Sequence, residues 1–195
     1  MKSEVISVKC SIVRGGTSKG IFILENELPS DPALREALSL AIDRPALAQA
    51  AGTAALPAEG LVPPGVPEND EGDFRALNAA LLDNSPESYE ARCTQARALL
   101  DEAGYNSGAD LGELEFLYLK NDVNDAVAQV LCQQWQEVLS VQAVPKGLPE
   151  RELMSALRAG EYALAGLSLT ASANDAECFL MSWTSGNREN LACYE

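Results

Sequence analysis

The second half of the chain alternates between short apolar runs and longer amphipathic segments. The runs at 114–119, 141–144 and 162–169 have the length of strands buried in a sheet. Between them, the segments 122–139 and 150–159 carry apolar residues at the spacing of helices that pack against a core. This β-α-β-α-β order predicts an α/β fold in which helices flank a largely parallel sheet.

Helices and a loop rich in proline precede this alternation. Apolar residues at helical spacing begin after Pro32 and stop at Pro45, and a further helical turn or two continues to Gly52. Residues 56–67 contain four prolines and two glycines, which exclude regular structure and predict a loop. A helix is expected over 87–103, because the glycine that follows it suits the left-handed conformation at a helix end.

The first thirty residues have the pattern of a β-hairpin. Val8, Cys10 and Ile12 alternate with polar residues, 14–20 turn the chain, and 21–24 form a second apolar run. The turn sequence R-G-G-T-S-K-G invites comparison with a phosphate-binding loop, but the motif G-x-x-x-x-G-K-[ST] is not matched. We therefore expect a glycine turn that joins two strands.

The charge balance and the residue types narrow the classes of function. Fourteen basic residues against twenty-nine acidic ones give a formal net charge of −15, which disfavours nucleic acid and anionic membranes as partners. The chain contains no histidine, so Ser-His-Asp and Cys-His catalysis and histidine-containing zinc sites are excluded within it. No calcium-loop pattern occurs, and the acidic residues are expected at helix N-termini and on solvated faces. We expect no metal or other cofactor, and no membrane insertion, because no run of about 18 apolar residues occurs.

The cysteines and one of the two tryptophans are expected in the core. The five cysteines form no C-x-x-C pair, so they are interpreted as small buried hydrophobes: Cys10, Cys93, Cys132, Cys178 and Cys193. Trp135 lies on the apolar stripe of its helix and is predicted to be buried. Trp183, near the end of a last helix expected over 175–183, is interpreted either as core or as part of a cleft wall.

Polar residues follow the last expected strand, where open α/β sheets bind ligands. Ser172, Asn174 and Asp175 come after the apolar run 162–169 and open the next helix. With Trp183 they form the candidate ligand-binding set. The alternative is a structural role, in which Asn174 or Asp175 caps that helix. Both interpretations stay open on the sequence.

A series of short motifs runs through the chain from about residue 31 to residue 195. In chain order they are ALREALSLAIDR (33–44), GLVPPG (60–65), ARALLDEAGY (96–105), the strand 114–119, LRAGEY (157–162), FL (179–180) and TSGN (184–187). This series resembles lobe two of the extracytoplasmic oligopeptide- and dipeptide-binding proteins, solute-binding protein family 5. The resemblance implies a periplasmic-binding-protein-like lobe that is not catalytic and binds a peptide or similar small ligand.

The same resemblance implies an extracytoplasmic location and the permease of an ABC importer as partner. No apolar stretch typical of a signal peptide is visible at the N-terminus. Family members usually carry an aspartate that pairs with the α-amine of the peptide, and that place falls on Ser172, with Asp175 as a nearby substitute. The other lobe has no counterpart in the chain, which is interpreted as a fragment or fusion. We therefore expect weak peptide binding by this chain alone.

The head of the chain resembles a different family. The string R-G-G-T-S-K-G-I-F, with Leu28-Pro29, is similar to the start of the methylaconitate isomerase and oxalomesaconate tautomerase family. The chain is accordingly divided into a hairpin segment, 1–30, and a partial binding lobe, 31–195. Two alternatives to a binding module stay open: an isomerase-like remnant that uses Cys10 or Lys19, and a chimera without retained function.

Overall fold

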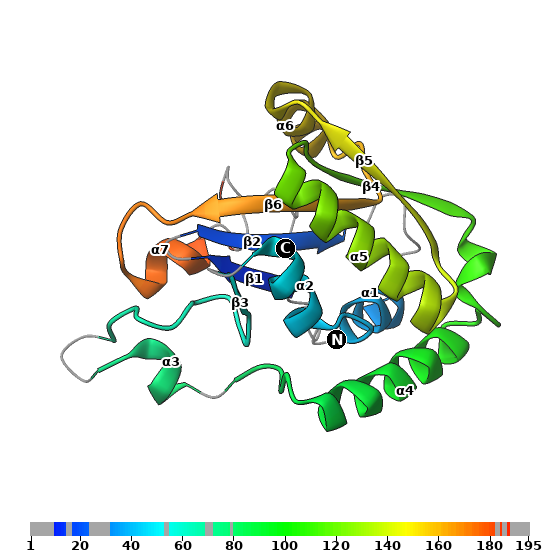
Figure 1. Ribbon diagram of the computed structural model, residues 1–195, viewed down its shortest axis with the longest axis horizontal. Coiled ribbons are helices and arrows are strands. Elements are labelled where there is room, and N and C mark those ends of the chain that lie inside the picture. The colour runs from blue at the N-terminus through cyan, green and yellow to red at the C-terminus, as the bar shows by residue number, and fades with distance from the viewer. Residues whose placement is uncertain are drawn as a thin grey trace, which may run out of the picture.

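The computed structural model describes residues 10–14, 17–23, 32–52, 55–68, 72–78, 80–181, 184 and 187. For a subset of these it describes only the backbone and not the side chains: residues 10–14, 17–23, 32 and 169. The elements follow in this order (Figure 1): β1 (Cys10–Arg14), β2 (Thr17–Ile23), α1 (Pro32–Leu40), α2 (Arg44–Ala51), β3 (Ala55–Pro57), α3 (Phe74–Leu77), α4 (Pro86–Glu102), a 3-10 turn η1 (Gly108–Leu111), β4 (Glu113–Leu119), α5 (Asp122–Leu139), β5 (Gln142–Leu148), α6 (Glu150–Ala159), β6 (Leu164–Thr170) and α7 (Ala176–Leu180). In the described ranges, no helix has both the length and the apolarity that crossing a bilayer requires.

The strands form one six-stranded sheet in the order β3-β1-β2-β6-β4-β5. β4 lies parallel to both β5 and β6, so the predicted β-α-β-α-β layer over 113–171 is confirmed. The other pairings, β2 with β6, β1 with β2 and β1 with β3, are antiparallel. The sheet is therefore parallel in its C-terminal half, as predicted, and antiparallel where the N-terminal strands join it.

The N-terminal hairpin is part of this sheet. β1 and β2 pair antiparallel, as the sequence predicts, and β2 pairs with β6 over its whole length, from Thr17↔Thr170 to Ile23↔Leu164. The predicted turn over 14–20 is too long, because Thr17–Gly20 already belong to β2. Pairing on both sides satisfies the backbone groups of these residues, and this outweighs the local preference of Gly20 for a turn. Val8 and the connection at 15–16 lie outside the described residues.

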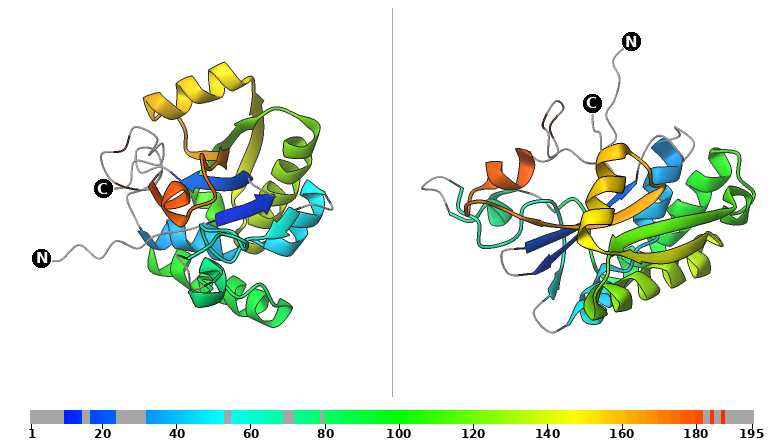
Figure 2. Two further views of the ribbon diagram at one scale, coloured as in Figure 1. Left: turned by 90° about the vertical axis from the view of Figure 1, so that its left-hand side faces the viewer. Right: turned by 90° about the horizontal axis from the view of Figure 1, so that it is seen from above.

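Helices cover the two faces of the sheet unequally. α1, α2, α4 and α5 cover one face, where Leu114, Phe116 and Tyr118 of β4 project into the main core. α6 covers part of the other face through Leu153 and Leu157, which pack against alternate strand residues. Figure 2 (left) shows α6 above the sheet and α4 below it. The predicted apolar stripe of the helix over 122–139 does face the core, since Leu131, Trp135 and Leu139 are buried there.

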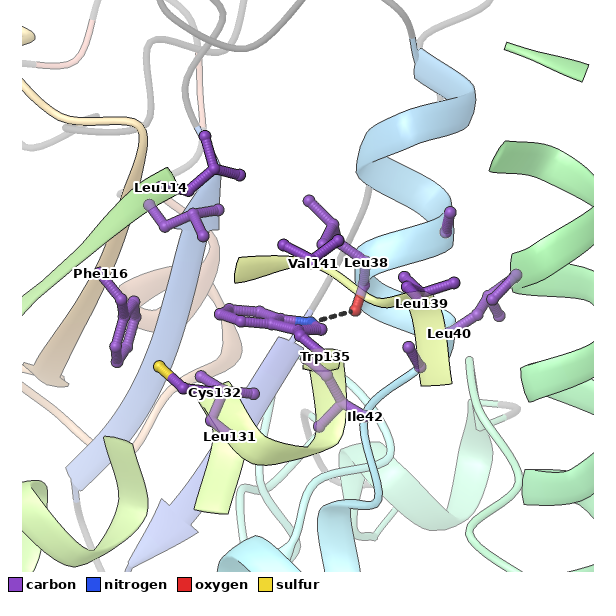
Figure 3. Close-up of a cluster of buried hydrophobic side chains, with 14 of the residues drawn as sticks. Leu38, Leu40, Ile42, Leu114, Phe116, Leu131, Cys132, Trp135, Leu139 and Val141 are labelled. Atoms are coloured by element: carbon purple, nitrogen blue, oxygen red, sulfur yellow. Dashed lines mark hydrogen bonds between the residues drawn. The ribbon is translucent and has the colours of Figure 1, made fainter. Parts of the chain in front are cut away.

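Trp135 joins α5 to α1 at the centre of the main core. Its side chain is fully buried, as predicted, and its ring meets that of Phe116 edge-on at 5.9 Å. Its Nε1–H donates to the carbonyl of Leu38 at 2.9 Å (Figure 3). This carbonyl lies in the last turn of α1, where the N–H of Ile42 donates instead to Ser39. Trp135 therefore caps a carbonyl that the end of the helix leaves without its usual partner.

Two of the described cysteines confirm the expectation of small buried hydrophobes. Cys93 and Cys132 are buried free thiols, and Cys178 is a half-buried free thiol. Burial raises the pKa of the Cys132 thiol to about 12, which keeps it protonated at neutral pH. The side chains of Cys10 and Cys193 lie outside the described residues.

Several element boundaries differ from the sequence-based expectations. β5 extends to Leu148 and includes Pro145, because an edge strand has one side on which a missing N–H costs no pairing. β3 is likewise an edge strand that occupies the start of the loop predicted over 56–67. α7 is shorter than the predicted 175–183, since Asp175 is its N-cap and Met181 its C-cap. α5 and α6 have the predicted bounds.

Candidate functional site

The carboxyl ends of β4, β5 and β6 lie along one edge of the sheet, because these strands are parallel. β4 ends at Leu119, and its last recorded pairing with β6 is Tyr118↔Gly166. Lys120 then donates its N–H to the carbonyl of Leu148 at 2.9 Å, so the pairing with β5 continues one residue past the end of β4. β6 continues to Thr170 with β2 beside it. Residues 168–170 therefore extend beyond β4 and have a strand neighbour on one side only among the described elements.

This extension of β6 is called the free edge below. Successive residues of a strand direct their N–H and C=O groups to opposite sides, so the free edge presents main-chain donors and acceptors where β4 has ended. An extended chain segment can add to such an edge by main-chain hydrogen bonds, with side-chain pockets providing selectivity. The geometry is suited to binding, and it requires no reactive side chain.

The predicted ligand residues follow the free edge directly, and the three that are described are exposed. The Ser172 hydroxyl donates to the Cys178 sulfur at 3.5 Å, and the Asn174 amide donates to the Gly65 carbonyl at 3.1 Å. The Asp175 carboxylate accepts the N–H of Glu177 at 2.8 Å, so it caps α7, as the structural alternative predicts. Trp183 lies outside the described residues, and its place at the site stays a prediction.

The segment before α3 is hydrogen-bonded to the loop that carries the predicted ligand residues. The N–H of Gly65 donates to the Asp73 carboxylate, which also accepts the N–H groups of Arg75 and Ala76 at 2.8 and 3.1 Å. These bonds, with that from Gly65 first, lower the pKa of Asp73 below its usual 3.8. Because Asn174 bonds to the Gly65 carbonyl, Asp73 indirectly positions the candidate site. The expected place of acidic residues at helix N-termini is confirmed for Asp73, which caps α3, whereas its bond to Gly65 was not predicted.

A polar cluster that the sequence analysis did not identify lies at the end of β4. The Tyr118 hydroxyl donates to Asp125 at 2.8 Å, and the Lys120 ammonium forms an ion pair with the same carboxylate at 3.1 Å. These two donors, Tyr118 first, lower the pKa of Asp125, while burial and the carboxylate raise the pKa of Tyr118 to about 12. The sequence signal was a tyrosine on the apolar face of a strand with an acidic residue in the next helix. In the described part of the chain, no three Cys, Asp or Glu side chains are grouped so that they could hold a metal ion.

We expect Tyr118→Phe to raise the pKa of Asp125 toward its usual 3.8, because the variant removes the strongest donor to the carboxylate. A carboxyl group whose pKa is lower in the folded state than in the unfolded chain stabilises the fold at pH values above its unfolded-state pKa. This stabilisation is lost as the pH falls through the pKa of the folded state. The variant should therefore lose less stability on acidification. Carboxyl ¹³C NMR titration measures the pKa, with Tyr105→Phe as the control. An unchanged Asp125 pKa would contradict the assigned hydrogen bond.

Comparison with known proteins identifies the family. The model of the bacterial extracellular solute-binding proteins, family 5, middle region, matches residues 7–190, a range that includes both strands of the hairpin. A curated relative is the probable deoxycholate-binding periplasmic protein YgiS of Escherichia coli K12, 31% identical over 170 residues, which are 87% of this chain and 30% of that protein.

Solved structures agree with this assignment at the level of the fold. OppA of Listeria monocytogenes, bound to peptide, aligns with a TM-score of 0.77 at 18% identity over 94% of this chain and 36% of that one. OppA of Burkholderia pseudomallei aligns with a TM-score of 0.72 at 24% identity over 97% and 35%. A peptide-binding protein of a peptide ABC transporter aligns with a TM-score of 0.76 at 19% identity over 91% and 78%. The chain thus spans about a third of the YgiS and OppA relatives, and it belongs to family 5 of the bacterial extracellular solute-binding proteins.

Proposed function

We propose that this chain supplies one wall of the ligand site of an extracytoplasmic solute-binding protein that delivers its ligand to an ABC importer permease. The observation that carries the proposal is the free edge of β6, followed directly by the exposed loop of Ser172, Asn174 and Asp175. Main-chain groups at a strand edge bind extended chains with little dependence on sequence. A peptide is therefore the ligand class that this geometry fits best, and the role is binding without catalysis.

Each polar residue of the loop has a distinct part in this proposal. Ser172 offers a neutral hydroxyl next to the free edge, and Asp175 offers the nearest negative charge for a peptide α-amine. One Asp175 oxygen already accepts the N–H of Glu177, so ligand binding would share a carboxylate that is held in place by the helix. Asn174 acts as a support, because its amide is bonded to Gly65.

An anionic amphiphile such as a bile acid is the second candidate ligand. The 31% identical relative carries the description deoxycholate-binding. Ser172 would not repel a carboxylate, and Leu180 and Met181, 37% and 48% exposed, offer apolar contact beside the loop. A peptide amine and a bile-acid carboxylate make opposite demands on the charge of Asp175, so one substitution separates the two ligand classes.

We expect short peptides to bind this chain with dissociation constants weaker than micromolar in calorimetric titrations. A single wall leaves the ligand half solvated, and association costs on the order of 4–15 kcal/mol of lost freedom. Where binding is measurable, Asp175→Asn should weaken peptides with a free amine by roughly tenfold or more, from the loss of a charge-assisted bond worth about 1.5–3 kcal/mol, and spare acetylated ones. Asparagine keeps the helix cap. Deoxycholate should bind the variant no more weakly than the parent.

Asp101→Asn, an exposed carboxylate on α4, is the matched control for the loss of one charge. Micromolar or tighter peptide binding would show that one wall suffices. Equal losses for free and acetylated peptides would rule out Asp175 as the partner of the amine.

The isomerase-like origin of the first thirty residues and the division of the chain at residue 31 stay predictions. β2 pairs with β6 from Thr17 to Ile23, so in this proposal the hairpin serves the binding lobe as a structural part of its sheet. Isomerisation of a tricarboxylic substrate by the purified chain, abolished in Lys19→Ala, would favour the isomerase-like alternative instead.

A further inference from the structure

Two buried arginines lie where α4 packs against the connection between α1 and α2. Arg44 is 1% exposed and Arg92 is 6% exposed, and these are the charged side chains that are buried among the described residues. Arg44 donates to two main-chain carbonyls at the end of α1 and just after it. Tyr89 of α4 donates its hydroxyl to the Ala41 carbonyl of the same stretch at 3.3 Å, and the guanidinium of Arg92 lies over the Tyr89 ring. Two buried cations thus meet around one short connection.

Arg92 uses only one of its three side-chain nitrogens for hydrogen bonds within the described part of the chain. Its Nη1 donates to the carbonyl of Asp83 and to the hydroxyl of Ser88, the latter at 3.1 Å. Its Nε and Nη2 are buried and have no hydrogen-bond partner there. These two nitrogens carry parallel N–H bonds on one edge of the planar guanidinium, an arrangement that binds two oxygens of a carboxylate or phosphate at once. This edge of Arg92 is therefore a complete binding group for an oxyanion.

No carboxylate of the described residues lies within ion-pair distance of Arg92. Asp83 offers Arg92 its main-chain carbonyl, whereas its carboxylate accepts the N–H and the hydroxyl of Ser85 at 2.9 and 3.0 Å. Burial, and after it the positive charge of Arg44, lower the pKa of Arg92, although a guanidinium stays charged at neutral pH. Burial of a charge is costly unless the charge is paired, so an anion at this place would stabilise the fold.

We propose that Arg92 binds a small tetrahedral oxyanion, of the class of inorganic phosphate or sulfate, on its Nε–Nη2 edge, with Arg44 as a second positive charge nearby. Because Arg92 is almost fully buried, the edge takes a free ion and not the phosphate of a lipid or polymer. The adjoining segment 80–85 contains no helix or strand and is exposed or half-buried, so Arg92 lies just beneath the surface. The bound ion joins α4 to the connection between α1 and α2. This site does not include the loop of Ser172, and the inference does not depend on the proposed function.

The test follows thermal unfolding of the chain while phosphate or sulfate replaces chloride at constant ionic strength. The midpoint should rise by several degrees and then saturate, as expected for one site that exists only in the folded state. Stabilisation by salts that are excluded from the protein surface continues to rise with concentration and depends on no single residue. Arg92→Gln should abolish the saturable rise, and Arg92→Lys, which keeps the charge without the planar edge, should weaken the affinity at least tenfold. Arg151→Gln, an exposed arginine on α6, is the matched control and should keep the parental response.

The ¹⁵Nε–¹Hε NMR signal of Arg92 gives a direct measurement on the parent chain, so the test does not depend on whether Arg92→Gln folds. The signal should shift as phosphate is added, with the same half-saturation concentration as the unfolding midpoint, while that of Arg151 stays in place. An Arg92 signal that does not move would overturn the proposal. So would a midpoint that rises without saturation, or one that rises equally in the parent and in Arg92→Gln. No change when phosphate and sulfate replace chloride would rule out an oxyanion as the ligand.

Discussion

Trp135→Ala is expected to destabilise this protein by about 3–5 kcal/mol, the range for truncating a buried tryptophan in a packed core. The side chain is fully buried, and it contacts Phe116 edge-on while its Nε1–H donates to the Leu38 carbonyl at 2.9 Å. The substitution therefore opens a cavity beneath the sheet and leaves a buried carbonyl of α1 without a partner (Figure 3). Loss of either contribution alone should cost less than loss of both.

Chemical denaturation followed by circular dichroism measures this effect, and two further variants divide it into its parts. Trp135→Phe keeps a ring against Phe116 but removes the donor, so about 1–3 kcal/mol should be lost through the unpaired carbonyl. Gln133→Ala, on the exposed side of α5, should change stability by less than about 0.5 kcal/mol. If Trp135→Phe were as stable as the parent protein, the capping role of the indole would be refuted.

The elements that the sequence predicted most closely are those whose limits are set by local chemistry. α5 begins where Asn121 can cap it, and α6 ends where Gly160 adopts a left-handed φ of 71°. Both signals are carried by one residue and its immediate neighbours, so they can be read without knowledge of the rest of the fold. The burial of Trp135 follows equally from the periodicity of its own helix.

Features that depend on pairing between distant segments could not be predicted in the same way. The seven residues of β2 contain glycine, serine and lysine, and they form a strand because β6 and β1 lie on either side. Pro145 stays within β5 because that strand is at the edge of the sheet, a fact that no local pattern contains. Context outweighs propensity in both cases.

The candidate site shows the same division. Its location after the third parallel strand follows from the alternation of strands and helices, and Ser172, Asn174 and Asp175 do lie together on that loop. The structure adds two partners that lie far from this loop in the sequence. Asn174 bonds to Gly65, 109 residues earlier in the chain, and Gly65 bonds in turn to Asp73, eight residues after it. The free edge of β6 is equally hidden in the sequence, because it arises from the register of two strands of equal length: β6 begins opposite Phe116, in the middle of β4, and therefore continues past the end of β4.

Gly108→Ala is expected to cost about 3 kcal/mol, at the upper end of the range for overpacking a buried position. Gly108 is buried where η1 passes beneath β5, and an added Cβ would lie 2.3 Å from Val141 Cγ2, 2.5 Å from the Leu139 carbonyl oxygen and 2.8 Å from the Val141 amide nitrogen. Two of these three neighbours are backbone atoms at the junction of α5 and β5. They cannot turn aside as a side-chain end can, so the junction itself must shift.

Gly147→Ala is the matched control, because its added Cβ would meet only the side chain of Lys120, at 3.1–3.2 Å. The lysine Cγ and Cδ can rotate toward solvent, because this side chain is 63% exposed, and the lysine Cβ, at 3.1 Å, needs to shift by only a few tenths of an ångström. The reduced freedom of the unfolded chain then favours the variant by about 0.4–1 kcal/mol, so Gly147→Ala should be neutral or slightly stabilising. Denaturation midpoints of the two variants measure the contrast. Equal stability of the two would show that the junction of α5 and β5 yields to Gly108→Ala, and would refute the close approach of η1 to Val141 on which this prediction rests.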